Sequence, residues 1–124
     1  MNSKVTMGLR ILFGIFCLVF GLNKFIGFLP MPVIEGDGGV LMGIYATSGF
    51  LNIIGVLEIL GGVALLANKF VPLVLTVMCD IMCNAFLIHA LHDMAGFGGA
   101  ALGMILNIAL VYAYRSRFSS LLSA

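Results

Sequence analysis

Four long apolar runs dominate this sequence, and they constrain the fold more than any other feature. Each run approaches the ~20 residues that an α-helix needs to cross about 30 Å of hydrocarbon. Short segments rich in glycine, proline and charged residues separate the runs. A helix satisfies its own backbone hydrogen bonds, which an apolar solvent cannot do. The pattern therefore predicts an all-α integral membrane protein, an antiparallel four-helix bundle with a single domain over residues 1–124.

The balance of apolar and charged residues also favours a protein that lies in a lipid bilayer. Hydrophobic residues make up 62% of the chain and charged residues 9%, whereas a soluble domain has about 45–50% and about 25%. Such a chain cannot cover itself with polar surface. The net charge of +1 and the scattered basic residues also argue against nucleic acid as a partner, because phosphate binding needs clustered Lys and Arg.

The lengths of the runs and the breaks between them predict the helix boundaries. We expect helices over residues 5–29, 48–67, 71–91 and 99–114, with an external loop over 30–47. Pro30 and Pro32 would end the first helix, since proline lacks the N–H donor and clashes with the preceding turn. A short interfacial helix is expected inside the loop at residues 40–45, and Asn68 with Lys69 turns the chain between the second and third helices.

Charges at the helix ends predict the orientation in the membrane. Four spans with short connections put both termini on one side. Five basic residues lie at that end of the predicted bundle: Lys4, Arg10, Lys69, Arg115 and Arg117. The positive-inside rule then makes both termini cytoplasmic. Lys24 is the one basic residue at the opposite end, where its long side chain can extend outward to the interface.

Two carboxylates fall within the predicted spans, and each needs a reason to be there. Insertion scales put an ionisable side chain at the centre of a span at a cost of about 2.5–3.5 kcal/mol. Glu58 lies ten residues before Asn68 and Asp80 lies eleven after Lys69, so an antiparallel helix pair brings both acids to one depth. Two carboxylates in one dry site would share a proton. We therefore predict Glu58 and Asp80 as catalytic, proton-handling residues.

Other polar side chains in or near the spans extend this candidate site. Asp80 and Asn84 are four apart and share one helix face. The predicted ligand-binding residues are Asn23, Lys24, Asn84, His89 and Asn107. The alternative is that these groups hydrogen-bond between helices and only hold the bundle together.

Sulfur-bearing side chains in the third predicted span suggest a different chemistry. Cys79 and Cys83 are four apart and Met78 and Met82 precede them, a set of soft ligands of the kind that Cu(I) favours. Cys and Met more often fill apolar space, and no electropositive neighbour is visible that would activate a thiol. We therefore predict no metal site, and a redox role for the cysteine pair stays open.

Short motifs in a fixed order carry a family resemblance. The sequence has GLNKF at 21–25, EILGG at 58–62, a proline at 72 and YAYR at 112–115. Over nearly the whole chain this order resembles the DoxX family of small bacterial membrane proteins. The residues that match family positions are Asn23, Lys24, Glu58, Asn84 and His89. Asp80 departs from the pattern, in which proline is usual, so an acidic pair would be peculiar to this chain.

The resemblance implies a multi-pass protein of the bacterial inner membrane with a redox association. We expect a subunit or accessory of a quinone-linked oxidoreductase, with no covalently bound cofactor, that binds a quinone-like hydrophobic molecule and handles protons through Glu58. The expected partners are the lipid bilayer, oxidoreductase proteins and further copies of the chain. Two alternatives remain: a small proton-coupled transporter or channel-like oligomer, and a membrane scaffold without a ligand.

Overall fold

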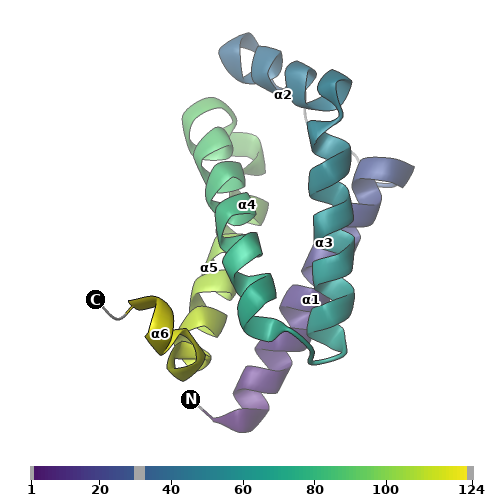
Figure 1. Cartoon of the computed structure of the whole chain (residues 1–124). Coiled ribbons are helices and arrows are strands. Elements are labelled where there is room, and N and C mark those ends of the chain that lie inside the picture. The colour runs from purple at the N-terminus through teal and green to yellow at the C-terminus, as the bar shows by residue number, and fades with distance from the viewer. Residues whose placement is uncertain (1, 30–32, 123–124) are drawn as a thin grey trace.

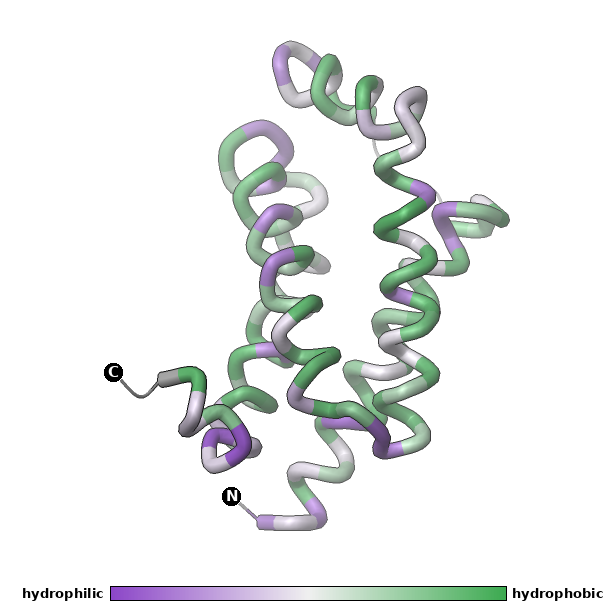
Figure 2. Tube along the Cα trace, in the orientation of Figure 1, coloured by the Kyte–Doolittle hydropathy of each residue, from purple (hydrophilic) through white to green (hydrophobic). Residues whose placement is uncertain are grey.

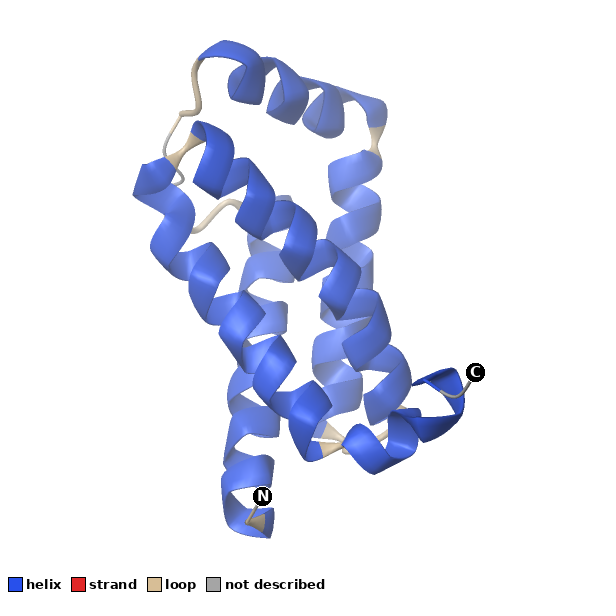
Figure 3. Cartoon of the chain, turned by 90° about the vertical axis from the view of Figure 1, so that its left-hand side faces the viewer, coloured by secondary structure: helices blue, strands red, loops and turns tan. Residues whose placement is uncertain are grey.

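The computed structural model describes residues 2–29 and 33–122, and all regular structure in these two stretches is helical. The long helices are α1 (Ser3–Ile26), α2 (Gly36–Ser48), α3 (Phe50–Leu66), α4 (Val71–His92) and α5 (Phe97–Ala113). Three short elements complete the order: η1 (Met94–Gly96), η2 (Arg115–Phe118) and α6 (Ser119–Leu122). Figure 3 shows the helices joined by short connections. The all-α prediction is therefore confirmed for the described residues.

Three segments are long and apolar enough to cross a membrane: α1, α4, and Met94–Ala113, which joins η1 to α5. α2 and α3 meet the same criterion only together, and they are bent by 76° at the break between them. Gly49 forms this break with φ of 90°, in the left-handed region that favours glycine. Residues 2–29 and 33–122 therefore contain three candidate spans, or four if the bent pair counts as one.

The helices form two pairs (Figure 1). α1 packs most extensively against α3, and α4 packs against α5, while α2 lies across one end of the bundle and contacts both α3 and α4. The two ends of the described chain lie at the opposite end from α2. The side chains at the centre of the core are fully or almost fully buried: Phe13, Cys17, Leu65, Leu75, Met78 and Leu110.

The outer surface of the bundle is apolar as well. Leu60, Leu73 and Ile105 are each more than 60% exposed, and Figure 2 shows hydrophobic residues along most of every long helix. A protein in water rarely exposes so much contiguous apolar surface. The helices and their outer faces are therefore compatible with a multi-pass membrane protein.

The first helix ends earlier than the prolines predict. α1 stops at Ile26, not at residue 29, because Gly27 adopts a left-handed conformation with φ of 69°. Its N–H donates to the Asn23 carbonyl at 2.9 Å, the single hydrogen bond of a left-handed helix cap. Pro30 and Pro32, which were expected to end the helix, lie outside the described residues.

The connection that was expected to be a loop is half helix. α2 covers Gly36–Ser48, longer than the predicted interfacial helix at 40–45. A Cβ on Gly38 would lie 2.5 Å from the Cβ of His92, so glycine lets the start of α2 lie directly on the end of α4. The bundle end that holds His89 and His92 is therefore covered by a helix, not by an open loop.

A tight turn joins α3 to α4 at the end of the bundle opposite α2. Asn68 and Phe70 both have positive φ, 57° and 54°. The guanidinium of Arg10 donates from Nη1 to the Leu65 carbonyl and, at 3.4 Å, to the Leu66 carbonyl. A cation at the last carbonyls of a helix also complements the helix dipole. Arg10 therefore caps α3.

Candidate functional site

α1 and α3 approach closely because glycines of one helix lie against glycines of the other. A Cβ on Gly62 would lie 2.8 Å from the Gly14 carbonyl oxygen, and one on Gly21 would lie 3.0 Å from the Gly55 carbonyl oxygen. Each helix spaces its two glycines by seven residues, so both contacts fall on one seam between antiparallel helices. Small residues permit this backbone approach in lipid.

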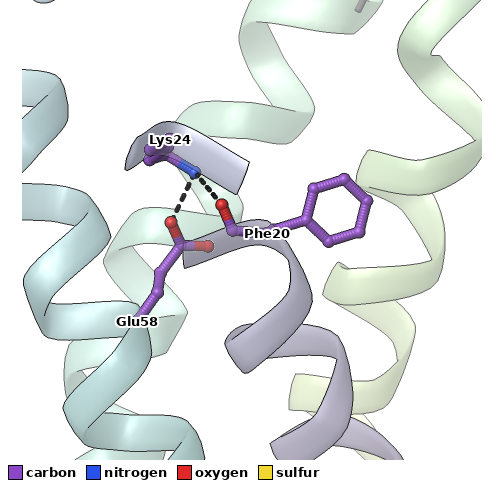
Figure 4. Close-up of polar contacts among 3 residues, drawn as sticks. All are labelled: Phe20, Lys24 and Glu58. Carbon is purple, nitrogen blue, oxygen red and sulfur yellow. Dashed lines mark hydrogen bonds and ion pairs between the residues drawn. The ribbon is translucent and has the colours of Figure 1, made fainter. Parts of the chain in front are cut away.

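An ion pair bridges the two helices beside the Gly21–Gly55 contact (Figure 4). Lys24 Nζ, from the last turn of α1, lies 2.5 Å from Glu58 Oε1 of α3. The same ammonium donates to the Phe20 carbonyl at 3.3 Å. A Cβ on Gly21 would lie 3.0 Å from the Cβ of Glu58, so glycine at this position makes room for the acid.

The two partners of this pair differ in access to the surroundings. The Glu58 side chain is 3% exposed, whereas that of Lys24 is 19% exposed. Lys24 was expected to extend outward, but its ammonium turns back to the acid and to the Phe20 carbonyl. Opposite charges attract strongly where the dielectric constant is low. Lys24 therefore lies between the buried Glu58 carboxylate and the surroundings of the bundle.

Cys17 belongs to the same site, although the sequence did not single it out as functional. It is fully buried and lies close enough to interact electrostatically with Glu58 and Lys24. Along α1 the steps from Gly14 to Cys17, Gly21 and Lys24 alternate between three and four residues. All four residues therefore lie along one stripe of the helix, the stripe that faces α3.

The predicted pairing of Glu58 with Asp80 is wrong. Asp80 is exposed and follows the buried Met78 by two residues, which turns its side chain to the opposite side of α4. Asn84, one turn on, is also exposed and donates to the Asp80 carbonyl at 3.2 Å and to Oδ1 at 3.4 Å. Equal depth along two helices did not bring the acids together, because depth does not fix the direction in which a side chain points.

Asn23, a predicted ligand-binding residue, has a local structural role. Its side chain is buried, and Oδ1 accepts the Leu29 N–H at 2.7 Å. Its carbonyl accepts the Gly27 N–H. Asn23 therefore holds the chain as it leaves α1, and this fixes the position of Lys24 in the same turn.

Asn107 and His89 lie apart from the ion pair. Asn107 is fully buried, and its Nδ2 donates to the Leu75 carbonyl at 3.2 Å, which joins α5 to α4. Its Oδ1 has no hydrogen-bond partner among the described residues. His89 Nδ1 lies 3.0 Å from Asp93 Oδ2 at the end of α4. The structure thus brings together Lys24 and Glu58, and it distributes Asn23, Asn84, His89 and Asn107 over separate places.

An apolar groove lies between α3 and α4, and neither Lys24 nor Glu58 lines it. Its volume is about 280 Å³, and its walls include Leu57, Gly61, Leu73 and Val77. Leu57 directly precedes Glu58 in the sequence. A groove with such walls suits a hydrocarbon chain better than a polar molecule.

The sulfur-bearing side chains do not form a site within the described residues. Cys79 is exposed, Cys83 is half-buried, and Cys17 lies on a different helix. Within the described residues, no group of three or more His, Cys, Asp or Glu side chains is placed to hold a metal ion. A redox role for Cys79 and Cys83 stays open.

Comparison of the chain with protein-family models, with curated proteins and with solved structures finds no match. The DoxX resemblance therefore stays a prediction from the short motifs.

Two of the site's features could have been found in the sequence. The glycine pairs at 14 and 21 and at 55 and 62 repeat with the same seven-residue spacing, which indicates two helix faces that match each other. Glu58 lies between the second pair, and Lys24 follows the first pair by one turn. Aligning the two helices antiparallel along their glycines places Lys24 and Glu58 three residues to either side of the Gly21–Gly55 contact, within reach of two long side chains.

Proposed function

We propose that this protein is a redox-associated accessory subunit of the bacterial inner membrane, in which Lys24 and Glu58 form an acid–base pair that serves a quinone-like molecule. The observation that carries the proposal is the 2.5 Å contact between Lys24 Nζ and a carboxylate that is 3% exposed. An ionisable group enclosed within a membrane-spanning helix is a functional-site hypothesis by default. The short DoxX-like motifs contain both residues and support the redox association.

The proposed placement in the membrane has four crossings with cytoplasmic termini. The crossings are α1, α3, α4 and α5, and α2, bent by 76° from α3, lies at the external interface. The start of α1, the α3–α4 turn and η2 carry Lys4, Lys69, Arg115 and Arg117 and lie at the end opposite α2, which supports this orientation by the positive-inside rule. The Lys24–Glu58 pair then lies in the external half of the membrane.

The chemistry of the pair is proton exchange between a buried acid and a lysine at the boundary. Lys24 has three N–H donors, of which one contacts Glu58 and one contacts the Phe20 carbonyl. The third is free to donate to a carbonyl oxygen. Glu58 holds the lysine in place and can accept its proton. A residue exposed on one side and hydrogen-bonded to a dry carboxylate on the other can pass protons in either direction.

The described residues fit a quinone in two respects. Its carbonyl oxygen needs a donor, which the third Lys24 N–H supplies, and its apolar tail needs hydrophobic surroundings, which the exposed apolar side chains of α1 and α3, such as Phe25 and Val56, supply. A quinone bound in this way contributes the redox chemistry. The chain contributes the donor, the proton and the apolar environment that excludes water.

Quinone binding by the purified chain in lipid nanodiscs tests the proposal. We expect a short-chain naphthoquinone to bind, and Lys24→Met to weaken its affinity about tenfold or more, because the hydrogen-bond donor is lost. Glu58→Gln keeps the shape of the side chain but cannot hold the ammonium by charge, so it should weaken binding as well. Asp37→Asn is the matched control, since it makes the same type of change on exposed α2.

Three outcomes count against this assignment. Wild-type affinity in both Lys24→Met and Glu58→Gln would exclude the ion pair from quinone binding and leave it as an interhelical contact, as in the scaffold alternative. No binding by the wild-type chain would exclude the ligand class. Proton-driven uptake of a solute into vesicles without quinone, lost in Glu58→Gln, would favour the transporter alternative.

A further inference from the structure

The outward face of α4 carries polar residues where lipid would be expected. Asp80 lies nine residues after the start of α4 and twelve before its end, close to the middle of a candidate span. Figure 2 shows hydrophilic segments partway along this helix. Asp80 and Asn84 are both exposed, and they hydrogen-bond only to each other among the described residues. A carboxylate that faces lipid at mid-depth is among the most unfavourable arrangements in a membrane protein.

The spacing of residues on this face is that of a helix-packing seam. From Leu73 the face continues in alternating steps of four and three residues, through Val77, Asp80, Asn84, Leu87 and Leu91. This heptad pattern keeps one stripe of a helix against a partner helix over several turns. Leu73, Leu87 and Leu91 are 63, 49 and 72% exposed, so the described residues leave most of the stripe uncovered, with Val77 half-buried against the core.

The outward face of α5 differs from that of α4. The outward positions of α5 are Leu102, Ile105 and Ile108, which are 47, 63 and 56% exposed and wholly apolar. They can face lipid at no cost. The polar pair at the centre of the α4 stripe therefore distinguishes this face from the lipid-facing surface of α5.

We propose that the outward stripe of α4 binds the same stripe of a second copy of this chain across a two-fold axis. Copies inserted the same way have parallel α4 helices, so residues of equal number face each other. The Asn84 amide has two N–H donors and an oxygen acceptor. Equal numbers bring the two Asp80 carboxylates together, and the two share a proton, which removes their repulsion. In each copy one Asn84 N–H contacts Asp80 of the same chain, and the second can reach Asp80 of the other copy, one turn away. The stripe is therefore complementary to itself in hydrogen bonding.

The apolar groove supports a helix as the occupant. Leu73 and Val77 belong to the stripe and also line the groove between α3 and α4, with a volume of about 280 Å³. Leucine side chains from a second α4 can enter the near edge of this groove, as knobs enter holes in paired helices. The inference rests on the membrane placement proposed above, and not on the acid–base chemistry of Lys24 and Glu58.

Dilution in lipid measures the association directly. Full chains labelled at the N-terminus with a donor or an acceptor fluorophore are reconstituted in vesicles of phosphatidylcholine and phosphatidylglycerol. We expect energy transfer that falls as lipid is added. In Asp80→Leu/Asn84→Leu the midpoint should shift by about tenfold toward higher protein density, the effect of roughly one interhelical hydrogen bond. Asp80→Asn should retain most of the association, because an amide also pairs.

Asn52→Leu is the matched control, since it removes an exposed polar side chain from α3 instead of α4. Its dilution curve should equal that of the wild type. Random proximity alone in the wild-type vesicles would overturn the proposal, and so would wild-type association in Asp80→Leu/Asn84→Leu. Association only with a different protein that is retained from the source membrane would likewise overturn the second copy as occupant.

Cysteine cross-linking locates the interface. In a chain with Cys17, Cys79 and Cys83 replaced by alanine, Leu87→Cys should form a disulfide dimer on mild oxidation, whereas Ile105→Cys should not. The bond requires the two Cα atoms to come within about 7 Å. The reverse pattern would overturn the choice of α4. Alkaline carbonate washing separates the two proposals: a chain released from membranes refutes both, whereas an embedded chain that stays monomeric refutes only the interface.

Discussion

The two carboxylates inside candidate spans, Glu58 and Asp80, have opposite environments. Glu58 lies in the seam of α1 and α3, is 3% exposed and contacts Lys24 at 2.5 Å. Asp80 lies on the outside of α4 with only Asn84 beside it. Both acids pose the same problem of a charge in oil. Lys24 of the same chain pairs with Glu58, whereas on our proposal a second copy of the chain pairs with Asp80.

Polar groups of α1 and α3 are thus paired within the chain, whereas on the proposed membrane placement the polar pair of α4 requires a partner outside it. Glycines bring α1 and α3 into backbone contact, Arg10 caps one end of α3, and Lys24 neutralises the acid near the other. Nothing comparable surrounds the polar pair of α4. The comparison predicts that substitutions in the seam destabilise the isolated chain, whereas substitutions at Asp80 affect its association.

Removal of the lysine should have the largest effect on stability. Lys24→Met leaves Glu58 buried without its counter-charge, and breaking a buried pair in this way costs about 3–5 kcal/mol. Unfolding of the purified chain in mixed detergents measures the loss. Lys24→Met/Glu58→Leu should recover most of it, because both charges are then absent. A loss in Lys24→Met below about 1 kcal/mol, the level of an exposed pair, would mean that Glu58 reaches water.

Filling the seam should have the next largest effect. Gly62→Ala introduces a Cβ that would lie 2.8 Å from the Gly14 carbonyl oxygen and from Leu18 Cγ. Overpacking of this kind costs about 1–3 kcal/mol, measured by the same detergent unfolding. Gly8→Ala in α1 is the control, since a Cβ there meets nothing within 4 Å. Gly8→Ala should be neutral or slightly stabilising. Equal effects of the two substitutions would contradict the close packing of α1 on α3 through their glycines.

Loss of the Arg10 cap should weaken α3 at its other end. Arg10→Met removes the hydrogen bonds to the Leu65 and Leu66 carbonyls, and hydrogen bonds to a charged group contribute about 1.5 kcal/mol at the lower end of their range. Hydrogen exchange of the α3 backbone should increase first near Leu66. Arg117→Met, at an exposed position of the same bundle end, should leave that exchange unchanged.

The smallest effect on stability is expected for substitution of Asp80. Asp80→Leu should change the unfolding free energy of the monomer in detergent by no more than about 0.5 kcal/mol, the usual range for surface positions. Its association in lipid should weaken instead, as in the dilution experiment. Strong destabilisation of the monomer would place Asp80 in a structural role inside its own chain and remove the contrast with Glu58.

The sequence predicted the helices well and their side-chain partners poorly. Periodicity and run length placed α4 within one residue at its end, because a bilayer demands a nearly fixed length of apolar helix. The same reasoning placed Glu58 and Asp80 at one depth, but it could not predict the direction in which each side chain points around its helix axis. Rotation depends on which face packs against which helix, and here the glycines of α1 and α3 decided it.

The sequence alone determined that the chain is suited to apolar surroundings, that it is all-α and that carboxylates lie inside its apolar spans. These properties follow from composition and local spacing. Only the tertiary structure decided that Lys24 neutralises Glu58, that Asn23 holds the end of α1 and that Asp80 faces outward. Those outcomes depend on contacts between residues far apart in the chain. Two helices of equal hydrophobicity can pack through several faces, and the choice rests on the fit of backbones and side chains across the seam.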